Sequence, residues 1–543
     1  MFALEDVLIP MRDGTRITAN VYGDSSITSP AVVIRTPYVK DRVCDPAHIS
    51  SPWTDFTADG FRSVSAEAVP SASDDIVFRT VNNLVERGYI VVLSDTRGTG
   101  YSEGVYDYYN LQAGRYDGFD SIEWVADQAW CNGNVGMWGI SASGVLAYSA
   151  AITRPPHLKA IAAYMCPADF YLDQWFPSGV FRYEDRMRWI MSLEHSLWPL
   201  DPGASSSPLF SFRRAVFEDR YRSYYERLRH GESPFNVSWA AQAATHVTYD
   251  DFWKEMSLWN KLDAVTVPVL NIGVLFDHFI RGTLRYQSAL RSTHQFGLLP
   301  GGLDVKQVSR DDEFDNHVIA WFDSYLRGES EPDSTQTRFF LTGVDCWTTE
   351  NSWGAETGTL SLPLSSSSDR ACGVLGGEGR RAVTHLKFDP ETPTGTPRNL
   401  EDQRDYEARS LVFSTVVLDH DITVVGVPRL GLFVSSDRSD FDICARLVDV
   451  QPNGHTRLVQ TGVLRASHRF SHAQPTLVVP GEVVQVSLEL PAVTHVFQRG
   501  HEVRLVLSLS DFPFYEHLPY PMTVFFHTGE ATPAVLELPL LSM

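Results

Sequence analysis

Ser141 is the residue whose neighbours most clearly predict chemistry. An apolar run at 135–140 precedes it and a second apolar run at 145–151 follows, which is the pattern of a short strand leading into a helix. Gly139 and Gly144 flank the serine in a Gly-x-Ser-x-x-Gly pattern, one residue longer than the usual Gly-x-Ser-x-Gly. Small residues allow a turn this sharp, and its strained backbone holds the hydroxyl up at the tip of the strand. We therefore predict that Ser141 is the nucleophile of an acyl-transfer reaction, provided that a base accepts its proton.

The segments around this turn, which we call the nucleophile elbow (residues 139–144), alternate between strands and helices. Continuous apolar runs are typical of strands that are buried on both faces of a parallel sheet. Strand–helix–strand alternation predicts such a sheet, with helical crossovers. The expected strands lie at 31–35, 89–95, 267–273 and 338–343, and the expected helices at 81–87, 117–128 and 312–327.

Composition divides the chain into three parts. From 169 to 258, aromatic and charged residues mix at helical spacing, which predicts a helical insertion. Beyond 351, helical periodicity disappears and short strands alternate with Gly, Pro and Asp, as in a β-sandwich. We predict an α/β core formed by residues 1–168 and 259–350, a helical cap at 169–258 and a β-sandwich at 351–543.

Bulk properties limit the partners of this chain. A length of 543 residues predicts several domains, and a net charge of −22 argues against nucleic acid and anionic membranes as partners. We find no apolar run long enough for a membrane helix and no signal-peptide pattern at the N-terminus. Six scattered cysteines without a Cys-x-x-Cys pair favour reduced thiols and a cytoplasmic location. Metal-ligand spacing is missing from the predicted helices and the glycines lack a dinucleotide-binding context, so we expect neither metal nor cofactor.

Several further motifs resemble those of the cocaine-esterase-like hydrolases, relatives of the X-Pro dipeptidyl-peptidases, glutaryl acylases and α-amino acid ester hydrolases. The matching stretches span nearly the whole chain and are Arg-Thr-Pro-Tyr at 35–38, Asp-Thr-Arg-Gly-Thr-Gly at 95–100, the runs 117–124 and 130–141, and, in the last third, 447–450, 462–465 and 496–501. The resemblance implies an α/β-hydrolase core, a helical cap and a C-terminal jelly-roll β-sandwich. It also implies an active site where these three parts meet.

The resemblance assigns roles to particular residues. The Tyr38 hydroxyl and the backbone N–H of Ala142 would stabilise the oxyanion, and Asp277 stands where the family keeps its triad aspartate. Phe279 and Trp175 would line an acyl pocket, although for Trp175 packing in the core is an equally good interpretation. The expected substrate is a small molecule with a hydrophobic acyl group. A homo-oligomer is compatible with the sequence, which leaves the oligomeric state open.

The triad histidine is missing at its expected place. Family members carry Gly-Pro-Trp-x-His after the next strand, whereas alignment on Pro300 puts Leu303 at the histidine position. Leucine accepts no proton, and a serine hydroxyl without a base is a poor nucleophile at neutral pH. Substitute bases that we consider are His278, which adjoins Asp277, and the more distant His294, His317 and Asp304.

Three classes of function therefore remain open. The first is a serine hydrolase of an ester or amide with a non-standard base. The second is a hydrolase fold used for non-hydrolytic chemistry in secondary metabolism, as a lyase, cyclase, isomerase or acyl transferase. The third is a binding protein without catalysis, which the intact elbow and Tyr38 argue against.

Overall fold

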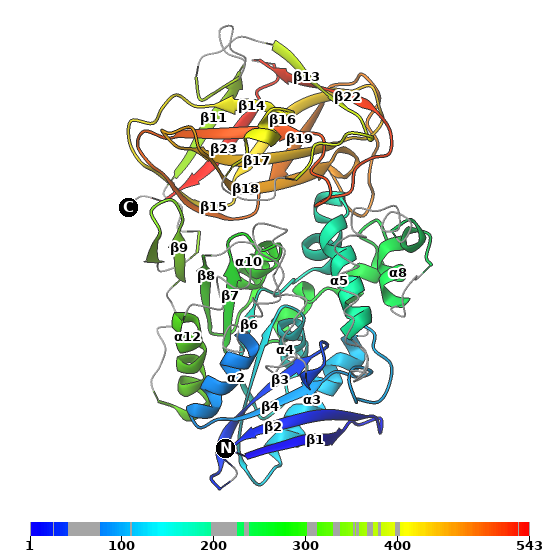
Figure 1. Ribbon diagram of the computed structural model, residues 1–543, viewed down its shortest axis with the longest axis vertical. Coiled ribbons are helices and arrows are strands. Elements are labelled where there is room, and N and C mark those ends of the chain that lie inside the picture. The colour runs from blue at the N-terminus through cyan, green and yellow to red at the C-terminus, as the bar shows by residue number, and fades with distance from the viewer. Residues whose placement is uncertain are drawn as a thin grey trace, which may run out of the picture.

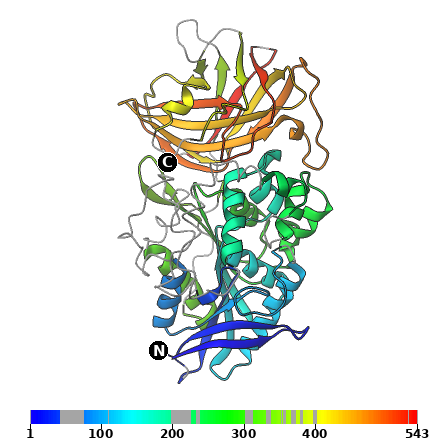
Figure 2. The same ribbon diagram turned by 45° about the vertical axis from the view of Figure 1, so that its right-hand side comes forward.

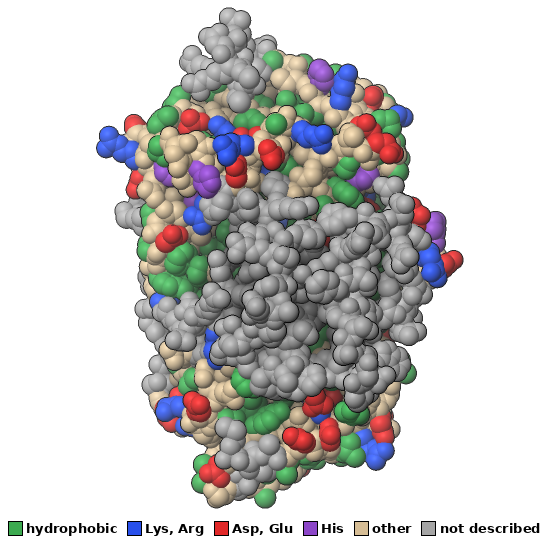
Figure 3. Space-filling view, in the orientation of Figure 1, with side chains coloured by type: hydrophobic (Ala, Val, Ile, Leu, Met, Phe, Trp, Pro, Cys, Tyr) green, Lys and Arg blue, Asp and Glu red, His purple; other side chains and the backbone are tan. Residues whose placement is uncertain are grey.

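The computed structural model shows a helix-covered sheet at one end of the molecule and a β-sandwich at the other (Figure 1). It describes residues 2–24, 26–41, 76–108, 111–196, 225–232, 238–300, 312–329, 337–350, 353–354, 358–365, 373–377, 382–396, 402–529 and 531–541. Within these residues, no helix is both long and apolar enough to cross a membrane. On the face in Figure 3, their acidic and basic side chains are interspersed at both ends of the molecule.

The core of the first part is a ten-stranded sheet within the described residues, with the order β1-β2-β4-β3-β5-β6-β7-β8-β9-β10. Strands β4 to β9 of this order run parallel, and β1, β2 and β10 add antiparallel edges. The bounds are β1 Phe2–Pro10, β2 Arg16–Gly23, β3 Ser29–Thr36, β4 Ile90–Asp95, β5 Cys131–Ile140, β6 Leu158–Tyr164, β7 Val269–Val274, β8 His294–Leu299, β9 Thr337–Leu341 and β10 Cys346–Glu350. Residues of β3 and β4 are buried throughout, as the apolar runs predicted.

Helices cover both faces of this sheet, so it has two hydrophobic cores. One core joins the sheet to α3 (Leu111–Ala126), α4 (Ala142–Ile152) and α10 (Ile280–Ala289). The other joins it to α2 (Ile76–Glu86) and α12 (Asp312–Phe322). Helix α4 is apolar and buried along nearly its whole length, because neighbours enclose it on all sides. The carboxyl ends of the parallel strands therefore meet at one edge, where loops carry functional groups.

A mostly helical insertion lies between β6 and β7. Its described elements are η2 Phe170–Trp175, η3 Pro177–Gly179, α5 Tyr183–Ser196, α8 Ser238–Thr245, α9 Asp251–Met256 and η4 Trp259–Ala264. Helix α5 extends between the sheet and the β-sandwich (Figure 1). We call this insertion the cap.

The C-terminal part is a β-sandwich built from thirteen strands of the described residues (Figure 2). Strand β11 joins its two layers, because it pairs with β23 in one and with β12 in the other. The bounds are β11 Gly358–Ser365, β12 Gly373–Leu375, β13 Ala382–Phe388, β14 Leu411–Ser414, β15 Ile422–Gly426, β16 Arg429–Ser436, β17 Asp442–Val450, β18 Thr456–Arg465, β19 Val484–Glu489, β20 Val493–Phe497, β21 Glu502–Ser508, β22 Met522–Thr528 and β23 Val535–Leu540, with a short helix α13 at Arg404–Glu407.

Candidate active site

The nucleophile elbow has the strained geometry that its sequence predicts. Ser141 connects β5 to α4 with φ 54° and ψ −119°, a conformation that non-glycine residues rarely adopt. Its N–H donates to the Tyr164 carbonyl at 2.8 Å, which ties the turn to the neighbouring strand. A Cβ on Gly139 would lie 2.3 Å from the Ser143 carbonyl carbon, and one on Gly144 would lie 2.1 Å from the Cys166 Sγ. Both glycines are therefore required by close packing of strand against helix.

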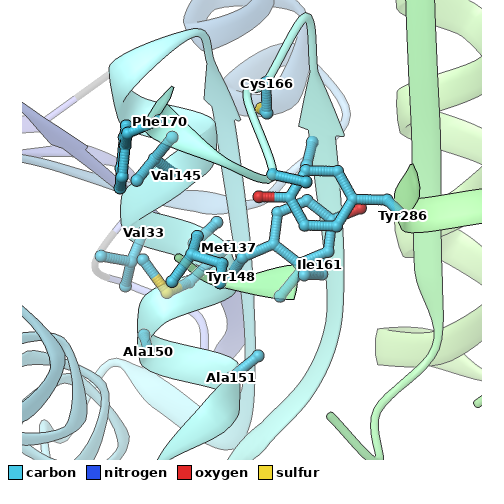
Figure 4. Close-up of a cluster of buried hydrophobic side chains, with 14 of the residues drawn as sticks. Val33, Met137, Val145, Tyr148, Ala150, Ala151, Ile161, Cys166, Phe170 and Tyr286 are labelled. Carbon is cyan, nitrogen blue, oxygen red and sulfur yellow. The ribbon is translucent and has the colours of Figure 1, made fainter. Parts of the chain in front are cut away.

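Aromatic packing beneath the elbow fixes its position. The rings of Tyr148 on α4 and Tyr286 on α10 stack with their centroids 3.8 Å apart (Figure 4). The Tyr286 hydroxyl donates to the Pro167 carbonyl at 2.8 Å, in the loop after β6. Cys166 in that loop contacts the backbone N–H of Ser141, and burial raises the pKa of its thiol. The elbow, the β6 loop and α10 thus form one packed unit.

Tyr38 lies beside the nucleophile. Its hydroxyl contacts the Ser141 side chain through a hydrogen bond and accepts one from the Trp189 Nε1 at 3.2 Å. Burial raises the pKa of the Tyr38 phenol to about 12, so the hydroxyl keeps its proton at neutral pH. The next residue, Val39, has φ 67°, which is strained for a β-branched side chain. The Lys40 N–H donates to a buried Asp95 carboxylate at 2.6 Å and holds this loop in place.

Asp277 follows β7 at the same edge of the sheet, and its side chain is buried. One carboxylate oxygen accepts the Phe279 N–H at 3.0 Å, whereas the other, Oδ1, has no hydrogen-bond partner within the described residues. Burial raises the pKa of Asp277 to about 7, against the opposing effect of the nearby Arg182 and Arg186 charges. The Cys166 thiol is in electrostatic contact with Asp277 as well as with the elbow. Asp277 is thus an ionisable group at the same edge of the sheet as Ser141, with one carboxylate oxygen that has no hydrogen-bond partner within the described residues.

His278 stands between two carboxylates. Its Nδ1 lies 3.5 Å from the Asp277 Oδ1 and its Nε2 lies 3.6 Å from the Asp185 Oδ2. These separations suit an electrostatic contact and are long for hydrogen bonds. The ring centroid of His278 lies 4.0 Å from that of Phe279, which in turn faces the cap.

Helix α5 of the cap and the residue before it complete the site with side chains that sequence reasoning missed. The Arg186 guanidinium carbon lies 5.0 Å from the Trp189 ring centroid and 6.0 Å from that of Phe279. Arg182, which immediately precedes α5, donates to the His278 carbonyl at 3.3 Å. Positions 182, 186 and 189 follow the i, i+4, i+7 spacing of one helix face. That spacing is the sequence signal, but only the fold shows that this face meets the nucleophile.

The structure thus brings Ser141, Tyr38, Asp277, His278 and Phe279 together, along with the first N–H groups of α4 at Ala142. Trp175 lies elsewhere: it has no exposed surface and packs against Phe181 and Trp253, with ring centroids 5.8 and 6.2 Å away. A side chain without accessible surface lines no water-accessible pocket, so packing in the cap core is its observed role.

Of the other candidate bases, His294 and His317 do not meet the elbow. His294 begins β8, at the end of the sheet opposite the elbow, and its Nδ1 is 2.8 Å from the Ser292 carbonyl. His317 belongs to α12, in the layer that covers the other face of the sheet. Leu303 and Asp304 lie outside the described residues. Within the part of the chain that the structure describes, no group of three His, Cys, Asp or Glu residues is arranged to hold a metal ion.

Comparison with known families gives two matches along the chain. A family model described as X-Pro dipeptidyl-peptidase (S15 family) matches residues 13–302. A second, described as the X-Pro dipeptidyl-peptidase C-terminal non-catalytic domain, matches residues 327–531. Among individual proteins, the cocaine esterase of Rhodococcus sp. is 28% identical over 553 residues, which cover 94% of this chain and 91% of that protein. A putative serine esterase of Mycobacterium bovis is 22% identical over 601 residues, with coverage of 94% and 91%.

Solved structures agree with this fold along its whole length. An aminopeptidase from a marine sediment Thaumarchaeota archaeon superposes with a TM-score of 0.81 at 23% identity, covering 100% of this chain and 96% of its own. An α-amino acid ester hydrolase gives a TM-score of 0.76 at 22% identity, with coverage of 99% and 96%. At these identities the likeness concerns the fold alone. It confirms the predicted α/β-hydrolase core with a separate C-terminal β domain.

Proposed function

The chain belongs to the X-Pro dipeptidyl-peptidase (S15) family and is an ester or amide hydrolase, and we propose that it acts through Ser141 with Asp277 as the base. The observation that carries this proposal is the contact between the Ser141 side chain and the Tyr38 hydroxyl at a strained turn. Backbone strain of this kind is characteristic of functional sites, because the fold must stabilise it elsewhere. The substrate is a small molecule whose acyl group lies against the aromatic rings of Phe279 and Trp189.

Two donors serve the oxyanion. Ala142 is the first residue of α4, so its N–H has no carbonyl partner within the helix. The helix N-terminus also carries a partial positive charge that favours an anion. Tyr38 supplies a protonated hydroxyl from the other side of the Ser141 side chain. Pre-aligned donors such as these stabilise charge that develops only in the transition state.

Asp277 takes the place of the missing histidine as general base. It accepts the proton of the Ser141 hydroxyl while the Oγ forms a bond to the substrate carbonyl carbon. The tetrahedral intermediate then expels the alcohol or amine, which leaves with the proton from Asp277. Water, deprotonated by the same carboxylate, adds to the carbonyl carbon of the acyl-enzyme. The bond to Oγ then breaks, Asp277 returns the proton to Oγ, and the acid is released. A base with a pKa of about 7 suits this exchange, because it both accepts and returns a proton near neutral pH.

The test uses p-nitrophenyl acetate and butyrate as substrates and a fluorophosphonate as a label. Ser141→Ala is expected to lose turnover and labelling, whereas Ser143→Ala, in the same turn, should keep both. Asp277→Asn should lower kcat by about 10²- to 10⁴-fold, the usual contribution of a general base. The wild-type rate should rise with pH through a midpoint near 7, where Asp277 becomes a carboxylate.

Two outcomes would overturn parts of this mechanism. Full activity of Asp277→Asn with loss of activity in His278→Gln would assign the base to His278. If Ser141 resists labelling while the protein converts its own substrate, the chemistry is not that of a serine hydrolase.

A further inference from the structure

Two buried arginines of the cap, near Tyr38 and Asp277, have N–H donors that find no hydrogen-bond acceptor within the described residues. Arg182 is 5% exposed and Arg186 is 1% exposed. The Nε and Nη1 of Arg182 and the Nη1 of Arg186 have no hydrogen-bond partner within the described residues. A guanidinium carries five N–H donors and stays charged, and leaving such donors buried and unpaired destabilises a protein.

The two guanidinium groups lie close to the side chains that the site brings together around Ser141. The charge of Arg186 acts on Tyr38, whose hydroxyl contacts the nucleophile, and on Asp277. The Arg182 guanidinium carbon lies 5.7 Å from the ring centroid of Phe514 in the β-sandwich. The pair therefore occupies the junction of core, cap and sandwich, next to the reacting groups.

Among the described residues, Arg186 has a carboxylate within ion-pairing distance and Arg182 has none. Arg186 donates from Nε and Nη2 to the Asp185 carboxylate, at 3.0 and 2.5 Å, so Asp185 neutralises one of the two arginines. Asp277 faces the pair too, and it offsets their charge only once it has lost its proton, above a pKa of about 7. Arg281 of α10 is close enough for its charge to interact with that of Arg182, although burial is the main reason that the pKa of Arg281 is lowered.

Glu516 of the β-sandwich does not pair with either of these two arginines. Glu516 approaches the cap but binds the Arg465 Nη1 at 2.9 Å and the Tyr225 hydroxyl. Its carboxylate therefore forms its ion pair with Arg465 and not with Arg182 or Arg186.

We propose that Arg182 and Arg186 bind a carboxylate carried by the acyl group of the substrate. The planar fork of a guanidinium matches a carboxylate in a bidentate arrangement, and burial strengthens the contact. The inference rests on the proposed function for the attack of Ser141 at the other end of the acyl chain. It narrows the substrate class to hemi-esters or hemi-amides of dicarboxylic acids, whose apolar middle lies against Phe279 and Trp189.

Binding of product acids tests the subsite without any turnover. The Ser141→Ala variant is titrated calorimetrically with succinate, glutarate and adipate, and with the monocarboxylates of equal chain length. At least one dicarboxylate is expected to bind about 10-fold or more tightly than its monocarboxylate. Arg186→Met should abolish this preference, and Arg291→Met, which removes an 80% exposed arginine, should retain it.

Hydrolysis gives a second readout. We expect kcat/KM for mono-p-nitrophenyl esters of the same diacids, whose second carboxylate is free, to be about 10- to 100-fold higher than for the neutral p-nitrophenyl methyl diesters, whose second carboxylate is methylated. Arg186→Met should remove this ratio, whereas Arg291→Met, at an exposed arginine outside the site, should retain it. Should Arg186→Met fail to fold because Asp185 loses its partner, Asp185→Asn/Arg186→Met removes both charges and serves instead.

The outcomes separate the two proposals. Equal affinity for dicarboxylates and monocarboxylates, together with Ser141-dependent hydrolysis of neutral esters, overturns the carboxylate subsite and leaves the hydrolase mechanism intact. A dicarboxylate preference that depends on Arg186, in a protein whose Ser141 is not labelled, supports the subsite and refutes the mechanism. A ratio that persists in the arginine variants would also overturn the inference.

Discussion

Replacing Asp277 with Asn should make the protein more stable, and increasingly so as the pH rises. Burial raises the pKa of this carboxyl from 3.8 to about 7. Between these two values the folded chain keeps a proton that the unfolded chain has lost, so the wild-type protein loses stability as the pH rises through this window. Asparagine does not ionise, and its carbonyl oxygen still accepts the Phe279 N–H. The stability of the variant therefore does not fall in this way as the pH rises.

The size of the effect follows from the shift in pKa. A rise from 3.8 to about 7 corresponds to about 4 kcal/mol above pH 7, at about 1.4 kcal/mol for each unit. Between pH 5 and pH 8 the advantage of the variant should grow by about 3 kcal/mol. If the residues that match the S15 family model, 13–302, unfold as a unit, this corresponds to roughly 4 °C in Tm.

Thermal unfolding at constant ionic strength and pH 5, 6, 7 and 8 measures this difference. Asp263→Asn is the control, because Asp263 is 75% exposed and its removal should give no difference that grows with pH. A Tm difference between Asp277→Asn and wild type that stays constant, or falls as the pH rises, would refute the reasoning. The same variant should lose catalysis, so a gain in stability would coincide with a loss of function, as is common for active-site groups.

Other substitutions test the elbow, the oxyanion site and the β-sandwich. Tyr38→Phe should lower kcat about 10²- to 10³-fold with little change in KM, because a donor to the transition state is lost; equal kinetics would exclude Tyr38 from this role. Gly139→Ala should lower the Tm or prevent folding, since its Cβ would lie 2.3 Å from the Ser143 carbonyl carbon, whereas Gly358→Ala, with open space around it, should have little effect. Asp511→Ala should destabilise the protein by about 3–5 kcal/mol in thermal or denaturant unfolding, because it leaves the buried Arg446, now 2.7 Å from Asp511, without its partner. A wild-type Tm in that last variant would show that the ion pair contributes little.

Local sequence patterns were sufficient to predict the nucleophile elbow and the main layers of the fold. Gly139, Ser141 and Gly144 specify a strained turn through sterics alone, and the apolar runs at 31–35 and 89–95 match β3 and β4. Such features were predictable because each depends on residues a few positions apart. The alignment that puts Leu303 at the position of the triad histidine also comes from the amino-acid sequence; it stays a prediction, and it leaves the identity of the base open.

The surroundings of Asp277 and of the cap arginines depended on tertiary structure. The raised pKa of Asp277 comes from burial among segments far apart in the chain, which no local pattern encodes. The amino-acid sequence does not distinguish Arg182 and Arg186 from solvent-exposed charges of a helix. The fold shows that both are buried between the core and the β-sandwich. The sequence by itself determined the fold and identified Ser141 as the candidate nucleophile, since sterics and hydrophobic periodicity act locally. Only the tertiary structure decided which charges surround that nucleophile, because desolvation and electrostatic contact arise from distant segments brought together.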